Sequence, residues 1–150
     1  YTKKYSIIYY INIYYLKQYV EVKLMEKYIK ITTAEMEVMQ EVWNFNEMVN
    51  IAELTAKLNE KGKMWAYQTV ATFLKSLKAK EMIDSCKKGK VLYYFLIVSK
   101  EKYKMKTTEN FVNTYFSGSL KNFLITFTNN KHLTEKELKE LREWLDNIDK

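Results

Sequence analysis

The sequence predicts an α+β fold that is mostly helical, with three helices and a β-hairpin in the first hundred residues and further helices after them. Three observations predict it. Capping-box patterns precede apolar residues at helical spacing. After residue 80 this spacing gives way to two short apolar and aromatic runs on either side of a glycine, which is typical of a hairpin. From residue 99 onward the helical spacing returns.

The first two predicted helices each begin at a capping box, in which a polar side chain and a glutamate three residues later satisfy each other's backbone amides. Thr32 with Glu35 marks the first start, and Asn50 with Glu53 marks the second. Apolar residues at helical spacing follow both. Gly62 supplies the stop of the second helix, because glycine adopts the left-handed conformation that ends many helices.

The third predicted helix follows Trp65 and ends near Lys80. Its buried face has i, i+3, i+4 and i+7 spacing and consists of Val70, Phe73, Leu74 and Leu77. Projection at about 100° per residue, the angle that 3.6 residues per turn imposes, places a second set on the opposite side. That set is Gln68, Ala71, Thr72 and Lys75.

A β-hairpin is predicted next, from runs at residues 82–87 and 91–98 that Lys88, Gly89 and Lys90 separate. Three helices followed by a hairpin with a basic tip is the order of a winged helix, a helix-turn-helix with a β wing. The predicted winged-helix domain spans residues 25–100.

The region 101–150 is predicted to be a helical dimerisation domain. Ser99 caps one helix that stops at Gly118, a second covers residues 120–127, and Thr134 with Glu137 opens a third. Short amphipathic helices bury little by themselves, so a second copy of the chain is their expected cover. The candidate dimer contacts are Phe111, Tyr115, Phe116, Phe123, Leu138, Leu141 and Leu145.

Residues 1–24 are a Tyr/Ile-rich run unlike the rest of the chain. Asn12, Lys17 and Gln18 interrupt it too often for a membrane span, and it lacks the small-residue cleavage site of a signal peptide. We expect an atypical extension upstream of a natural start at Met25. The alternative is an amphipathic arm that packs on the dimer, and N-terminal mass or start-codon mapping separates the two.

Composition argues against an enzyme. No two glycines lie close enough for a nucleotide-binding loop. Cys86 is the only cysteine and His132, in a polar stretch expected to be a loop, the only histidine, so we expect no disulfide, no metal and no cofactor. No acid/base pair lies in a setting that would perturb its pKa. A lone cysteine fits a reducing cytoplasm.

Charge favours a polyanionic partner. The net charge is +7, from 25 Lys and Arg against 18 Asp and Glu, and residues 61–90 hold a local excess of lysine. Glutamine pairs with adenine and lysine reaches guanine or phosphate, so the exposed face of the third helix suits a DNA major groove. A merely solvated helix face is the alternative. The candidate DNA contacts are Gln68, Thr69, Ala71, Thr72, Lys75, Ser76, Lys78, Lys80, Lys87 and Lys88.

Over residues 29–148 the chain resembles the penicillinase and methicillin-resistance repressors and their copper-responsive relatives. The resemblance rests on ITTAEMEVMQEVW, on W-x-x-x-TVxTxLxxLxxK from Trp65 to Lys80, and on the wing ending in YYF. KMKTTENFVN at 104–113 and LTEKELKELREWL at 133–145 extend it. It implies a repressor that binds a palindromic double-stranded operator as a homodimer and controls a resistance operon of the β-lactam type.

The sequence also departs from these families at several positions. The copper-responsive branch carries a multi-cysteine metal motif in its tail, which is missing here, so metal sensing is disfavoured. In the antibiotic-responsive branch a membrane sensor triggers proteolysis at an Asn-Phe bond, and alignment places that bond at Thr126-Phe127, where the Asn is absent.

Two more departures lie in the third helix, where the family has a polar cap and an arginine at the positions of Ala66 and Ser76. Loss of the cap costs about 1 kcal/mol of helix stability. Both changes motivate an alternative function, a dimeric interaction or anti-repressor module of the same fold without specific DNA binding. A mobility shift with the promoter upstream of the gene, at several salt concentrations, separates the two functions.

Overall fold

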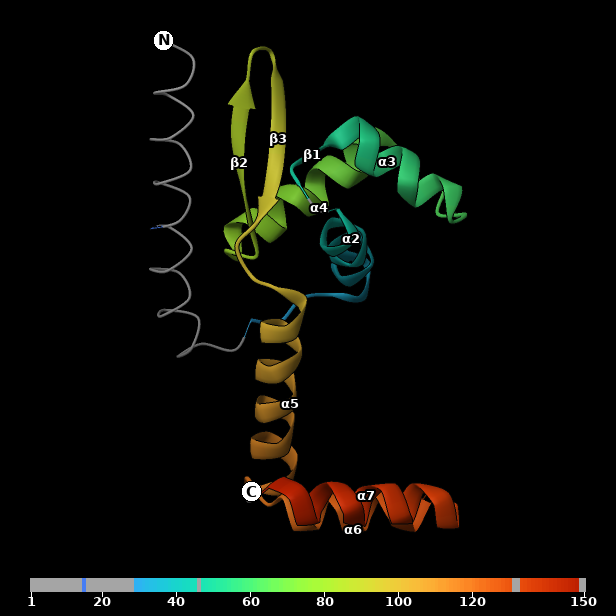
Figure 1. The fold of residues 1–150 in the computed structure, drawn as a ribbon. Coiled ribbons are helices and arrows are strands. Elements are labelled where there is room, and N and C mark those ends of the chain that lie inside the picture. Colours follow the sequence, from blue (N-terminus) through green and yellow to red (C-terminus); the bar gives the residue numbers. More distant parts are fainter. Residues whose placement is uncertain (1–14, 16–28, 46, 131–132, 149–150) are drawn as a thin grey trace. The chain divides into compact units, whose positions relative to one another are not determined.

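The computed structural model describes residues 15, 29–45, 47–130 and 133–148 (Figure 1). The chain forms two compact units, Tyr1–Thr107 and Thr108–Lys150, so the division falls inside α5. The elements are α2 (Thr33–Asn44), β1 (Val49–Asn50), α3 (Ile51–Glu60), α4 (Tyr67–Ala79), β2 (Ile83–Lys88), β3 (Val91–Leu96), α5 (Lys100–Phe116), α6 (Leu120–Asn130) and α7 (Glu135–Ile148). The predicted mostly helical α+β fold is confirmed. The predicted extension at 1–24, apart from Tyr15, and the predicted loop residue His132 lie outside the described residues.

The predicted helix starts are confirmed in detail. The Thr32 amide donates to Glu35 Oε2 at 2.6 Å, and the Glu35 amide donates to Thr32 Oγ1 at 3.3 Å. Asn50 and Glu53 repeat this arrangement at the start of α3. These pairs form because the first amides of a helix have no partner within the helix.

A short strand that the sequence analysis missed completes the sheet. β1 pairs antiparallel with β3, and β3 pairs antiparallel with β2, in the order β1-β3-β2. β2 begins one residue later than predicted and includes Lys88, which pairs with Val91. Gly89 then opens a two-residue turn with φ +62°, a conformation that glycine adopts without strain. The hairpin β2-β3 projects beyond the helices of the first unit (Figure 1).

The core of the first unit lies among α2, α3, α4 and the sheet. The predicted buried stripe of α4 is confirmed for Val70, Leu74 and Leu77, which are fully buried. Phe73 lies at the edge of the core, with its ring 5.1 Å from that of Trp65. One face of α4 is therefore fixed in the core, and the opposite face is left outside.

The second unit consists of the last part of α5 with α6 and α7. Thr134 and Glu137 form the predicted capping box of α7. The helix predicted over 120–127 continues to Asn130, and in this added part the Thr128 hydroxyl donates to the Leu124 carbonyl at 2.8 Å. Among the residues of this unit whose side chains are described, none is buried. No helix in the described part of the chain has the length and hydropathy to cross a membrane.

Candidate nucleic-acid interface

An exposed polar stripe runs along α4 opposite its buried side. Gln68, Thr72 and Lys75 lie at i, i+4 and i+7 and are all exposed. The Thr72 hydroxyl donates to the Gln68 carbonyl at 2.9 Å, which leaves its methyl group for outside contacts. Within the described residues, the side-chain amide of Gln68 and the ammonium group of Lys75 make no hydrogen bond or ion pair. The stripe thus presents one amide, one methyl and one ammonium group to a partner.

Two predicted contacts lie on the flanks of α4 rather than on this stripe. Ala71 is half-buried and packs against the core, so the projection that grouped it with the exposed residues was wrong for this residue. Thr69 is also half-buried. At about 100° per residue, Ala71 follows Val70 by only a quarter turn and stays near the core.

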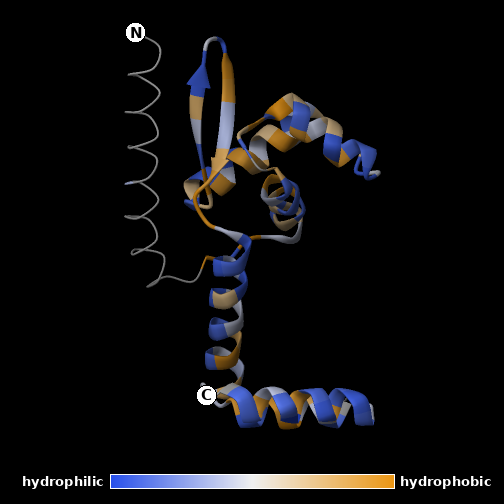
Figure 2. Ribbon diagram, in the orientation of Figure 1, coloured by the Kyte–Doolittle hydropathy of each residue, from blue (hydrophilic) through white to orange (hydrophobic). Residues whose placement is uncertain are grey.

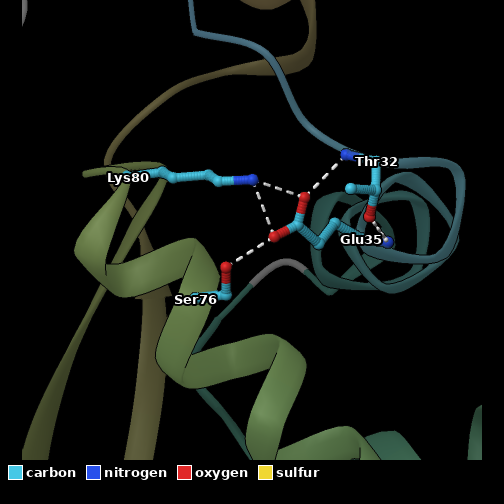
Figure 3. Close-up of polar contacts among 4 residues, drawn as sticks. All are labelled: Thr32, Glu35, Ser76 and Lys80. Atoms are coloured by element: carbon cyan, nitrogen blue, oxygen red, sulfur yellow. Dashed lines mark hydrogen bonds and ion pairs between the residues drawn. The ribbon is translucent and has the colours of Figure 1, made fainter.

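Ser76 and Lys80 contact Glu35 on the flank opposite Ala71 (Figure 3). Lys80 Nζ donates to both carboxylate oxygens, at 2.8 and 2.6 Å, and Ser76 Oγ donates to Oε1 at 2.6 Å. Ser76 and Lys80 were predicted to contact DNA, whereas in the structure their polar groups bind Glu35.

The Glu35 side chain is only 4% exposed, yet it stays charged. Burial raises the pKa of this carboxyl, but hydrogen bonds from Lys80, Ser76 and Thr32 outweigh burial and lower the pKa from its ordinary value of 4.5 to about 2. At neutral pH, Glu35 and Lys80 therefore form an ion pair that links α2 to α4.

Other lysines of the basic region are also paired within the protein. Lys78 Nζ lies 2.8 Å from Asp84 Oδ1 and donates to Ser85 Oγ at 2.7 Å, which ties α4 to β2. Lys61 pairs with Glu41, and Lys63 pairs with Glu37 at 2.7 Å. Four of the eight lysines between residues 61 and 90 thus neutralise acidic groups of the same chain: Lys61, Lys63, Lys78 and Lys80.

The remaining cations lie on α4 and the hairpin. Lys75, Lys87 and Lys90 are exposed and make no ion pair with any described residue. Lys88 Nζ lies 5.6 Å from the centroid of the Tyr93 ring, a cation-π contact that keeps the charge at the surface. Figure 2 shows the hydrophilic tip of the hairpin. These lysines supply positive charge on α4 and at the tip of the hairpin.

The start of α4 is fixed without the usual cap. Ala66 is the N-cap residue and makes no side-chain cap, as the sequence predicted. Instead, Asn59 Oδ1 accepts from the Trp65 amide at 2.8 Å and Asn59 Nδ2 donates to the Trp65 carbonyl at 3.2 Å. This clamp holds the turn that enters α4, where Met64 has the unusual φ of 53°. No local pattern identified Asn59, because its partner lies across a turn.

A comparison with protein families gives the identity. The family model described as penicillinase repressor matches residues 31–147. The chain belongs to the penicillinase repressor family. It is thus a transcriptional repressor and not an enzyme, as predicted.

The repressor is similar to named relatives over most of its length. The penicillinase repressor of Staphylococcus aureus is 30% identical over 127 residues, which are 85% of this chain and 99% of that protein. The methicillin resistance regulatory protein MecI of Staphylococcus epidermidis is 30% identical over 122 residues, 80% of this chain and 96% of its own.

Among solved structures, the DNA-binding domain of the repressor BlaI is 30% identical, with a TM-score of 0.45 over 51% of this chain and 92% of that chain. The Bacillus licheniformis BlaI monomer in complex with the blaP half-operator is also 30% identical, with a TM-score of 0.43 over the same shares of the two chains.

The second unit of the repressor holds the predicted dimer contacts. Phe116 and Phe123 are half-buried and pack edge to face with ring centroids 5.4 Å apart. Leu141 is half-buried as well, whereas the other predicted contacts stay exposed: Phe111, Tyr115, Leu138 and Leu145. Figure 2 shows hydrophobic residues along α6 and α7. The described residues of this unit therefore leave much of its apolar surface exposed.

The predicted cleavage position lies inside a regular helix. Thr126 and Phe127 belong to α6 and are exposed, and the Phe127 ring lies 5.9 Å from that of Phe123. The peptide bond between them is thus held in helical conformation in the last turns of α6.

Proposed function

We propose that the repressor binds a palindromic double-stranded DNA operator as a homodimer, with α4 in the major groove and the hairpin β2-β3 along the phosphates. The observation that carries the proposal is the exposed stripe of Gln68, Thr72 and Lys75 on a helix whose other side is buried. A major groove admits one α-helix, and its base edges are read by side chains of these types.

Each group of the stripe has a distinct part in the proposal. The Gln68 amide can donate and accept at once, which matches the edge of adenine. The Thr72 methyl packs on a thymine methyl, because the Thr72 hydroxyl is engaged by the helix backbone. Lys75 reaches guanine or a phosphate. The preferred half-site is accordingly mixed in sequence and leans toward A·T pairs.

The hairpin lysines supply affinity rather than sequence choice. Lys87 and Lys88 are exposed at the end of β2 and Lys90 in the turn that follows, where a phosphate backbone beside the groove would pass. Each phosphate that a lysine neutralises releases counterions, so binding weakens as salt rises. Ser76 and Lys80 are left out of the DNA contacts because Glu35 engages them.

The second unit supports assembly as a homodimer. None of its residues with described side chains is buried, so its aromatic and leucine residues need cover from elsewhere. A second copy supplies that cover through a self-complementary interface. Two copies related by a two-fold axis present two α4 helices, which matches an operator with two inverted half-sites.

The family supports a role in the cytoplasm as the repressor of a resistance operon of the β-lactam type. Its release from DNA would follow cleavage by a membrane sensor protease. The candidate bond is Thr126-Phe127 in α6. Because a protease binds an extended chain, cleavage requires local unwinding of the last turns of α6. Mass spectrometry of the repressor from induced cells tests this step, and intact chains after induction would contradict it.

The anti-repressor alternative was based on two residues, Ala66 and Ser76, and the structure describes the surroundings of both. Ala66 provides no side-chain cap, but the hydrogen bonds between Asn59 and Trp65 hold the turn before α4. Ser76 donates to Glu35, so in this chain the position contributes to the contact between α2 and α4.

A mobility shift tests the proposal as a whole. The probes are a duplex of the promoter immediately upstream of the gene and a scrambled duplex of the same composition, each titrated from low to physiological salt. We expect tighter binding to the promoter at every salt concentration and a fall in both affinities as salt rises. Equal affinities for the two duplexes would contradict sequence-specific repression.

A further inference from the structure

One carboxylate joins the first turn of α2 to the last turn and the C-cap of α4 (Figure 3). Glu35 Oε1 accepts from Ser76 Oγ and Lys80 Nζ, and Glu35 Oε2 accepts from Lys80 Nζ and from the Thr32 amide. All four distances lie between 2.6 and 2.8 Å. Glu35 therefore contacts the N-cap of its own helix and two residues at the C-terminal end of α4.

The two contacts on α4 lie where they control rotation. Ser76, in the last turn of α4, and the C-cap residue Lys80 are four residues apart, on the flank between the buried side and the exposed stripe. The apolar contacts of Val70, Leu74 and Leu77 are non-directional, so they resist separation of the helices more than rotation. Hydrogen bonds to a buried carboxylate are directional and short, and they resist rotation of α4 about its own axis.

Rotation of α4 matters for base recognition. With a helix radius of about 5 to 6 Å including side chains, a turn of about 20° moves a side-chain end by about 2 Å. A hydrogen bond to a base edge tolerates only a few tenths of an ångström around 2.9 Å. A contact between a hairpin lysine and a phosphate is unaffected, because these lysines are not on α4.

We propose that Glu35 is a positioning residue for operator recognition, which sets the rotation of α4 through Ser76 and Lys80 and so places Gln68 and Lys75 in the groove without touching DNA. This inference rests on the proposed function, in which α4 reads the operator. It assigns Lys80 to the positioning of the helix and not to phosphate binding.

The chain offers a matched control in Glu41. Glu41 also lies on α2 and is also buried, at 5% exposure, and it also pairs with a lysine. Its partner Lys61 follows α3 and is not part of α4. Loss of the Glu41 carboxylate removes an ion pair between a buried carboxylate and a lysine, while leaving the contacts of Glu35 with Ser76 and Lys80 in place.

The experiment compares full-length Glu35→Gln and Glu41→Gln with the wild type, by titration of the upstream promoter duplex and of a scrambled duplex. Circular dichroism establishes that each variant is folded at the assay temperature. We expect Glu35→Gln to weaken promoter binding by about tenfold, the effect of one to two directional contacts, and binding to the scrambled duplex by less than about twofold. We expect Glu41→Gln to keep the wild-type ratio of the two affinities even where its melting temperature falls.

A milder variant keeps the test decisive if Glu35→Gln does not fold. Ser76→Ala removes one of the two α4 contacts and leaves the ion pair, and we expect about a threefold weakening confined to the promoter duplex. The inference is overturned if folded Glu35→Gln keeps the wild-type ratio of promoter affinity to scrambled-duplex affinity. If Glu35→Gln does not fold, an unchanged ratio in Ser76→Ala overturns it. An equal fall of the ratio in Glu41→Gln also overturns it, because a general decrease in stability then explains the effect. A wild type without promoter preference refutes the proposed function itself, and this inference with it.

Discussion

Replacement of Gln68 by alanine isolates the base-reading part of the proposed interface. The Gln68 side chain is exposed and makes no hydrogen bond with any described residue, and alanine favours helix more than glutamine does. The free protein should therefore change in stability by less than about 0.5 kcal/mol. Any weakening of binding then reports the complex alone.

The expected effect follows from the contact that the amide makes. One bidentate pair with a base contributes about 1 to 3 kcal/mol of discrimination, which is about 5- to 150-fold in affinity for a half-operator. A homodimer on a palindrome carries two such pairs, so the effect on a full operator doubles in free energy to about 2 to 6 kcal/mol. On a scrambled duplex the affinity should stay nearly the same, because a base contact is absent there.

The assay titrates wild type and Gln68→Ala on the full operator, on one half of it and on a scrambled duplex in the same buffer. Gln40, an exposed glutamine of α2, provides the matched control, and Gln40→Ala should leave all three affinities unchanged. Equal weakening of the operator and the scrambled duplex by Gln68→Ala would refute the placement of α4 in the groove.

Four further outcomes are expected. Leu141→Asp should give monomers in sedimentation that no longer bind the operator tightly, since a carboxylate replaces a half-buried leucine of the proposed interface, whereas a monomeric wild type at micromolar concentration would rule the interface out. Neutralising Lys87 or Lys88 should weaken all DNA binding alike and reduce the slope of log K against log salt by about one for each phosphate that is no longer neutralised, and an unchanged slope would remove the hairpin from the phosphates. Asn59→Ala should lower the free energy of unfolding by about 1 kcal/mol in urea titrations, and no change would mean that the clamp does not stabilise the turn before α4. Because the pKa of Glu35 falls from 4.5 to about 2 on folding, the stability it contributes, about 3 kcal/mol, is present above pH 4.5 and is lost as the pH drops toward 2, so the stability difference between wild type and Glu35→Gln should shrink between pH 6 and pH 3 in denaturant titrations.

The sequence by itself determined the elements whose cause is local. The capping boxes at Thr32 and Asn50 join residues three apart, so the pattern of letters already contains both partners. The buried stripe of α4 follows from helical periodicity, and the hairpin follows from two strand-like runs around Gly89. Uncapped Ala66 was likewise visible in the sequence alone.

The tertiary structure decided what depends on residues far apart in the chain. β1 has only two residues, too few for a periodic signal, and it exists because Val49 pairs with Tyr94. The lysines between residues 61 and 90 are visible in the sequence, but only the packed structure shows that Lys78 pairs with Asp84 and Lys80 with Glu35. A formal charge is a property of one residue, whereas its availability to DNA depends on which carboxylate the fold brings within about 3 Å of it. For the same reason Glu35 was visible as the cap of α2, and its contact with α4 became visible only once the two helices were packed together.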